Sequence, residues 1–233
     1  MIGYARAIIL SCVTAFLWVL FMSTAWANFS ISPMNQYISP KHKTVSYTLQ
    51  NLSNKKAAYK ITALIRHLLP DGTEQRKMTK ELRVFPSKII LEPGQKKRIK
   101  VLYLGSRQLR TEKAYRVIFK QTGLDVSEQK DLGPQIKYEF VTALYVTPKK
   151  AAAEIKTNVK NQGQYLELVL HNSGNKHHIL QDWQLKLFNS AGKSQLYTAE
   201  LPAINLLANT KITLKLAPQI SMPGVSRAEL LVK

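Results

Sequence analysis

The feature that most constrains the fold is a two-residue alternation of hydrophobic and polar side chains, which recurs along the chain after residue 27. It is clear in Val45-Ser46-Tyr47-Thr48-Leu49 and returns in six further segments: 59–65, 99–103, 115–119, 166–170, 183–187 and 212–216. Alternation places the hydrophobic residues of each segment on one face of a half-buried strand. Turn-forming residues such as Pro70-Asp71-Gly72 separate the segments, and no long helical period follows residue 27. The pattern predicts an all-β sandwich or barrel.

The first 27 residues have the pattern of a secretory signal peptide. Arg6 precedes an apolar run from Ala7 to Met22, and Ala25-Trp26-Ala27 fits the motif that signal peptidase cleaves. The alternative is a permanent membrane anchor, but the run is shorter than the roughly 20 residues that span a bilayer. We therefore expect cleavage after Ala27, export to the periplasm, and a mature chain without a membrane span that begins at Asn28.

Cysteine content and charge narrow the possible roles. The only cysteine, Cys12, lies in the signal peptide, so the mature chain forms no disulfide and hydrophobic cores alone must hold the fold. The formal net charge is +20, a balance that often indicates nucleic-acid binding. Here the basic residues are scattered, no aromatic–basic recognition motif is present, and export excludes routine contact with nucleic acid. The charge favours an acidic partner or an anionic membrane surface instead.

A domain boundary is expected near Thr147-Pro148-Lys149, where a long strand ends and a new alternating segment follows from Glu154. The expected units are residues 28–148 and residues 149–233. Two sequence echoes link the halves: 49–55 resembles 170–176, and 91–94 resembles 206–209. Two echoes in the same order favour a duplicated sandwich unit.

Four segments together carry a resemblance to a known family. They are Asn28-Phe29-Ser30-Ile31-Ser32-Pro33, Val84-Phe85-Pro86-Ser87-Lys88-Ile89-Ile90-Leu91-Glu92-Pro93-Gly94-Gln95, Ala114-Tyr115-Arg116-Val117-Ile118-Phe119 and Ala143-Leu144-Tyr145-Val146-Thr147-Pro148. On these segments the chain resembles the periplasmic pilus chaperones of the chaperone–usher pathway, most closely the alternate branch that serves class 5 fimbriae. The second segment is the most specific of the four.

The resemblance implies two immunoglobulin-like β-sandwich domains of the PapD-like type, set at an angle with a cleft between them. It also implies a non-enzymatic role without a cofactor: binding pilus or fimbrial subunits, stabilising them and delivering them to an outer-membrane usher. Such a chaperone lends a strand to an incomplete subunit, which is β-augmentation in physical terms. The implied donor strand runs from about Leu132 to Val146, and its groove-filling residues are Leu132, Ile136, Tyr138 and Phe140. The alternative for these side chains is the domain's own core.

The better-known branch of the family anchors the subunit's terminal carboxylate with an Arg and a Lys, and the matching positions here hold Gln36 and about Ala143. The usual pair is therefore absent. Arg116 is the replacement candidate, because counting back along the two strands places it beside residues 142–144, and Arg binds carboxylates bidentately. The alternative for Arg116 is a solvated surface position.

Other chemistry is weakly indicated. Three histidines raise the question of a metal site: His171, His177 and His178. They accompany no cysteine and no ordered carboxylate spacing, so the sequence does not favour metal binding. No nucleophile elbow or phosphate loop is present. Trp183 is expected in the core of the second domain. Two competing functions remain, an exported metal-binding enzyme on a sandwich fold and a passive binding module or pilus subunit.

Overall fold

The computed structural model describes residues 28–123, 137–217 and 224–231. Within these ranges the chain is built of strands, and none of its helices is long and apolar enough to cross a bilayer. The expected signal peptide and two of the expected donor residues, Leu132 and Ile136, lie outside the described residues.

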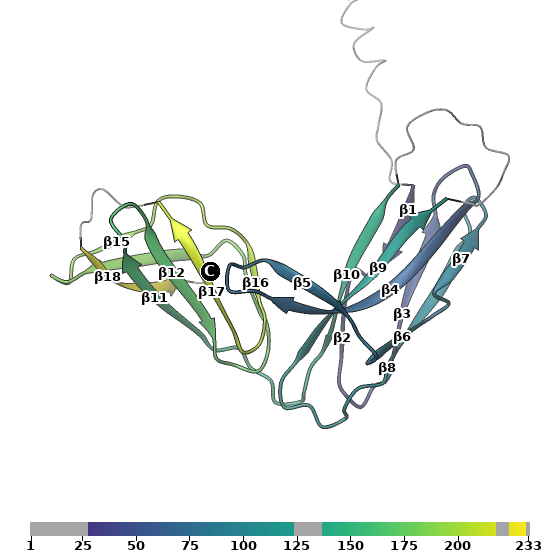
Figure 1. Cartoon of the computed structure of the whole chain (residues 1–233), viewed down its shortest axis with the longest axis horizontal. Coiled ribbons are helices and arrows are strands. Elements are labelled where there is room, and N and C mark those ends of the chain that lie inside the picture. The colour runs from purple at the N-terminus through teal and green to yellow at the C-terminus, as the bar shows by residue number, and fades with distance from the viewer. Residues whose placement is uncertain (1–27, 124–136, 218–223, 232–233) are drawn as a thin grey trace, which may run out of the picture.

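The first domain is a sandwich of two sheets (Figure 1). Its strands are β1 (Phe29–Ser32), β2 (Asn35–Ile38), β3 (Thr44–Asn51), β4 (Ala57–Leu68), β5 (Glu74–Met78), β6 (Leu82–Phe85), β7 (Lys88–Leu91), β8 (Lys96–Tyr103), β9 (Lys113–Thr122) and β10 (Glu139–Val146). One sheet has the order β1-β3-β8-β6, and the other has the order β2-β10-β9-β4-β5 with β7 also paired to β4. The alternating hydrophobic residues of β3, β4, β8 and β9 meet between the sheets and form one core, as the sequence predicted.

The second domain has its own core and smaller sheets. Its strands are β11 (Ile155–Asn161), β12 (Leu166–Asn172), β13 (His178–Leu180), β14 (Gln184–Asn189), β15 (Ser194–Leu196), β16 (Ile204–Leu206), β17 (Thr210–Leu216) and β18 (Val225–Leu231). They form the groups β11-β12-β17, β13-β16 and β15-β14-β18. Trp183 is 4% exposed within this core, as expected, and its indole N–H donates to the Pro202 carbonyl at 2.9 Å.

The sequence echo between the domains corresponds to one repeated structural device. Asn51 and Asn172 each end a strand, and both are fully buried. The Asn51 Nδ2 donates to the carbonyls of Lys55 and Leu91, and the Asn172 Nδ2 donates to those of Lys176 and Leu207. A buried amide satisfied in this way fixes the turn after the strand against a distant segment. The same bonds at both positions support the duplication that the echo predicted.

The two domains form the arms of a V, and the strand pair β4–β5 reaches from the first arm to the second (Figure 1). At its tip the Pro70 carbonyl accepts a hydrogen bond from the Thr213 amide at 2.7 Å. Leu68, at the end of β4, packs against the core of the second domain. The hairpin therefore links the domains at a point other than the chain connection.

Candidate functional site

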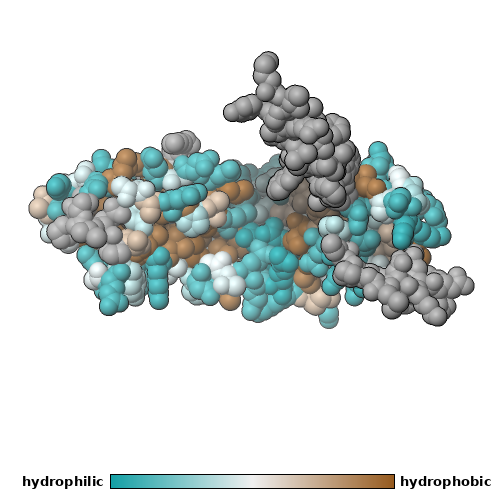
Figure 2. Space-filling model, turned by 90° about the horizontal axis from the view of Figure 1, so that it is seen from above, coloured by the Kyte–Doolittle hydropathy of each residue, from teal (hydrophilic) through white to brown (hydrophobic). Residues whose placement is uncertain are grey.

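The face of the β2-β10-β9-β4-β5 sheet that points away from the first core looks into the opening of the V. On β10, Leu144 and Val146 belong to the first core, while Ala143 and Tyr145 lie on the opposite face. Ala143 and Tyr145 pack with Leu207 of the second domain and close the base of the V. Seen from above, hydrophobic side chains gather along the middle of the second domain (Figure 2). The V is therefore an open cleft with an apolar base.

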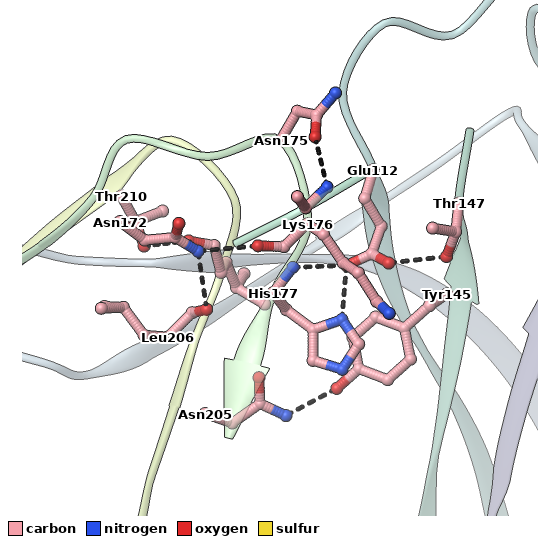
Figure 3. Close-up of polar contacts among 12 residues, drawn as sticks. Glu112, Tyr145, Thr147, Asn172, Asn175, Lys176, His177, Asn205, Leu206 and Thr210 are labelled. Atoms are coloured by element: carbon pink, nitrogen blue, oxygen red, sulfur yellow. Dashed lines mark hydrogen bonds and ion pairs between the residues drawn. The ribbon is translucent and has the colours of Figure 1, made fainter. Parts of the chain in front are cut away.

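A buried polar pair also joins the domains at this base (Figure 3). Glu112 Oε1 lies 2.5 Å from His177 Nδ1 and accepts the His177 backbone N–H at 2.9 Å, and its other oxygen accepts the Thr147 hydroxyl at 2.6 Å. Burial raises the pKa of Glu112, but the bonds from His177 and Thr147 outweigh it, so the pKa is lowered. The carboxylate is therefore ionised and fully engaged at neutral pH.

Stacked rings extend the same junction. The rings of Tyr145 and His177 stack with centroids 3.9 Å apart, and Tyr37 of β2 stacks on Tyr145 at 5.3 Å. Asn205 of the second domain donates to the Tyr145 hydroxyl at 2.6 Å. Because these contacts come from both domains, they set the angle of the V.

This arrangement gives His177 a structural partner, since Glu112 binds its Nδ1. Within residues 28–123, 137–217 and 224–231, no group of three or more His, Cys, Asp or Glu side chains is arranged to hold a metal ion. His171 and His178 belong to different strand groups of the second domain, β11-β12-β17 and β13-β16. The three histidines of the sequence therefore form no common site.

Arg116 lies on the cleft face of β9, directly opposite Ala143 of β10, within the window that the sequence count gave. Its side chain is 18% exposed, so it is not a freely solvated arginine. Two of its nitrogens bind one carboxylate: Nε lies 3.0 Å from Glu74 Oε1, and Nη2 lies 2.5 Å from Glu74 Oε2. This bidentate geometry is the one by which Arg recognises a carboxylate.

Two further arginines contact the same carboxylate. Arg76 Nε lies 2.6 Å from Glu74 Oε1, and Arg66 Nε lies 2.6 Å from Oε2, although this last pair lacks the alignment of a hydrogen bond. Burial raises the pKa of Glu74, but bonds from Arg116 and Arg76 and the nearby positive charges outweigh it and lower the pKa to about 2. We call Arg66, Arg76, Arg116 and Glu74 the arginine cluster. Three guanidinium groups around one carboxylate leave the cluster positively charged.

The two positions where the better-known branch carries its anchor pair are occupied differently here. Gln36 of β2 lies opposite Leu144, and its side-chain amide donates to the Ser46 carbonyl at 2.9 Å. Ala143 contributes only packing at the base of the cleft. Positive charge on this face is instead concentrated in the arginine cluster.

β10 has an open edge over half of its length. β9 pairs with the whole strand, but β2 pairs in parallel only with Ala143–Val146. Along Glu139–Thr142, no strand among the described residues pairs with the edge opposite β9. An unpaired row of backbone N–H and C=O groups is what an incoming strand needs. Of the expected donor residues, Tyr138 and Phe140 fall in or beside this part.

Tyr138 and Phe140 are half-buried and border the first core. The Phe140 ring packs edge-on against Phe29 with centroids 4.7 Å apart. Phe140 therefore serves the domain's own core at least in part, because β1 begins beside it. The register agrees with the sequence in placing Glu139 and Val141 on the other face.

Sequence reasoning did not find Arg66, Glu74, Arg76 or the Glu112–His177 pair. One signal was present: Arg66 directly follows Ile65, the last hydrophobic residue of an alternating segment, so the alternation places Arg66 on the face away from the core, as it does Arg116 on its own strand. The pairing of β4 with both β5 and β9 brings these residues together, and alternation carries no information on which strands pair.

Comparison with models of known protein families gave no match, and no curated protein sequence matches the chain. Solved structures do match. A chaperone–tip adhesion subunit complex, CsuC–CsuE from the archaic Csu pili of Acinetobacter baumannii, contains a chain 17% identical to this one. The match has a TM-score of 0.64 and covers 88% of this chain and 97% of that chain.

Two more matches are of the same kind. The class 5 fimbriae chaperone CfaA is 14% identical with a TM-score of 0.58, covering 88% of this chain and all of that chain (100%). A chain in the complex of the SafA pilin with the SafB chaperone of Salmonella enterica is 12% identical with a TM-score of 0.54, covering 91% of this chain and 99% of that chain. The chain therefore has the fold that its resemblance implied, the two immunoglobulin-like β domains of chaperone–usher chaperones.

Proposed function

We propose that this protein is a periplasmic chaperone that binds pilus or fimbrial subunits by donating the edge of β10, and that it delivers them to an outer-membrane usher. The open edge at Glu139–Thr142 is the observation that carries the proposal. Similar solved structures support it, since two of them are complexes of a chaperone with a subunit or pilin. The basic charge of the chain suits an acidic partner.

The hydrogen-bond pattern of β10 identifies the backbone groups that a subunit would use. The Tyr138 carbonyl accepts the Gln121 amide of β9, whereas the Ala143 amide donates to Met34 on the other side. In an antiparallel pair the direction of these groups alternates by residue. The N–H and C=O groups of Glu139 and Val141 therefore point to the open edge. A subunit strand would bond to them while its groove receives the neighbouring hydrophobic side chains.

The arginine cluster is the proposed site for the subunit's terminal carboxylate. Arg116 is the anchor, and Arg66 adds a second guanidinium on the same face. A pocket of about 420 Å³ opens beside Arg66, between the β4–β5 hairpin and the second domain. Its lining includes Thr73, Asn205 and Leu214, so the terminus would touch both domains.

The domain division follows the cores. The first core draws its buried residues from 29–146 and the second from 159–228, which supports the proposed boundary at residues 148–149. The open edge favours strand donation over an exported metal-binding enzyme or a passive binding module, neither of which needs one, and the two separate cores argue against a single-domain pilus subunit.

Co-purification of Tyr138→Asp from periplasm, beside a thermal melt, tests strand donation. We expect the variant to fold and to lose its subunit, because an unpaired charge would enter an apolar groove. The matched control is Tyr165→Asp, the same change at a half-buried tyrosine of the second domain, which should retain the subunit. If folded Tyr138→Asp recovers as much subunit as wild type does, strand donation by this segment is rejected.

A further inference from the structure

The arginine cluster is already occupied by a carboxylate of the same chain. Glu74 takes the Nε–Nη2 fork of Arg116 in the bidentate geometry that a chain terminus would require. An external carboxylate can use this Nε–Nη2 fork only if Glu74 yields at least one of its hydrogen bonds. Glu74 and an external carboxylate therefore compete for the same donors.

The cluster nevertheless retains capacity for a second anion. Arg66 is almost completely buried, with its side chain 6% exposed, and its Nη1 has no hydrogen-bond partner among the described residues. Burying an unpartnered donor of a charged group is costly. Arg66 also lines the pocket that opens between the hairpin and the second domain. An unpartnered donor in the wall of an opening gives an incoming carboxylate a second positively charged contact.

The position of Glu74 connects this site to the rest of the molecule. It begins β5 and lies opposite Leu68, and the tip of the hairpin is hydrogen-bonded to Thr213 of the second domain. The carboxylate is thus held at the cluster by a hairpin fixed at both ends. It is placed to return to Arg116 when an external carboxylate leaves.

We propose that Glu74 is a built-in competitor: it fills the Arg116 fork in the free protein and weakens the binding of a carboxylate ligand enough for release. The natural ligand, a subunit's terminal carboxylate, rests on the proposed function. The competition itself is a property of this chain and is measurable without a subunit. In the free protein the same carboxylate offsets the repulsion between three guanidinium groups.

Acetate is the simplest probe, titrated into the mature chain at constant ionic strength while NMR follows the arginine Nε–H signals. Glu74→Gln should bind acetate at least about tenfold more tightly than wild type, because hydrogen bonds to charged groups contribute on the order of 1.5–3 kcal/mol. Acetamide, which is neutral, should not bind. Arg116→Ala in the Glu74→Gln background should abolish the gain.

Glu81→Gln is the matched control. Glu81 is a partly buried carboxylate of the same domain, bound to Lys113 and Tyr115, and it contacts no arginine of the cluster. The control removes the same charge. An equal increase in acetate affinity in both variants would mean that the loss of one negative charge, and not competition at Arg116, causes the increase, and it would overturn the proposal. Unchanged acetate affinity in Glu74→Gln would overturn it as well.

A second variant, Glu74→Asp, keeps the test decisive if Glu74→Gln fails to fold. Glu74→Asp keeps the charge near the arginines but withdraws the carboxylate by one methylene, so it should weaken the Arg116 bonds and tighten acetate binding to a smaller extent. A folded Glu74→Asp protein with wild-type acetate affinity contradicts competition. Loss of strand donation in the Tyr138→Asp experiment is a separate result, since it leaves acetate binding unaffected.

Discussion

Val141→Pro tests the open edge of β10 at the level of a single backbone group. The Val141 N–H points away from β9, so proline removes a donor that the domain's own ladder does not use. Proline is tolerated in this situation because its nitrogen faces the free side of an edge strand. The preceding residue, Phe140, is already in a strand, which suits the restriction that proline imposes on it. We expect a folded protein with a defective edge.

The loss of binding has two parts. The missing hydrogen bond costs about 1 kcal/mol, and the partner carbonyl that it leaves unsatisfied costs about 1–3 kcal/mol more. The sum, about 2–4 kcal/mol, corresponds to a loss of affinity of about 30- to 1000-fold. The ring also occupies the space of the partner strand, so the upper part of this range is expected.

Subunit recovery from periplasm and a thermal melt together give the answer. Val141→Thr is the matched control, because it keeps the N–H and a β-branched side chain, and it should bind as wild type does. Thr142→Pro is the opposite control: that residue faces the β9 ladder, so the domain itself should be destabilised. A folded Val141→Pro protein that recovers as much subunit as Val141→Thr would refute pairing at this edge.

Three further outcomes are expected. Arg116→Ala should lower subunit recovery at least about tenfold while Lys137→Ala changes it little, since a charged hydrogen bond contributes on the order of 1.5–3 kcal/mol; equal recovery by the two variants would return Arg116 to a structural role. The pKa of Glu74 is lowered from 4.5 to about 2, so its contribution to stability is complete above pH 4.5 and disappears as the pH falls toward 2. As the pH is lowered from 4.5 toward 2, the melting temperature should therefore fall less in Glu74→Gln than in wild type. Periplasmic protein should have the mass of a chain beginning at Asn28 and melt identically with and without dithiothreitol, because Cys12 is absent from it; a mass that includes residues 1–27 would contradict cleavage.

Fold class and core were predictable because alternation reports directly on which side chains are buried. Tyr47, Val101 and Val117 are fully buried, as the two-residue period predicted. The repeat was visible because the same turn, built around a buried asparagine, occurs in both domains. Local pattern was sufficient in each of these cases.

The candidate site was predicted only in part, because it depends on which strands become neighbours. Arg116 was found by counting along two strands that are consecutive in the sheet and in the described sequence. Glu74 and Arg66 reach it only through the β5-β4-β9 order, which no local pattern encodes. The Glu112–His177 pair forms across two domains: the sequence drew attention to His177 only as a possible metal ligand, and no local pattern indicates Glu112 as its partner.

The register of β10 explains why an open edge and an arginine cluster belong to one site. β2 begins its pairing at Ala143, so a strand added along Glu139–Thr142 must end there. Ala143 lies opposite Arg116 on the neighbouring strand. Neighbouring strands are about 4.8 Å apart, so the added strand lies two spacings, about 10 Å, from β9, and its end must bend across Ala143 to meet the Arg116 side chain. If the added strand runs parallel to β10, its terminal carboxylate arrives level with Arg116 from the side of β10, whereas Glu74 reaches Arg116 from β5. The length of the open edge therefore selects a partner that ends in the cleft, and the arginine cluster recognises that end.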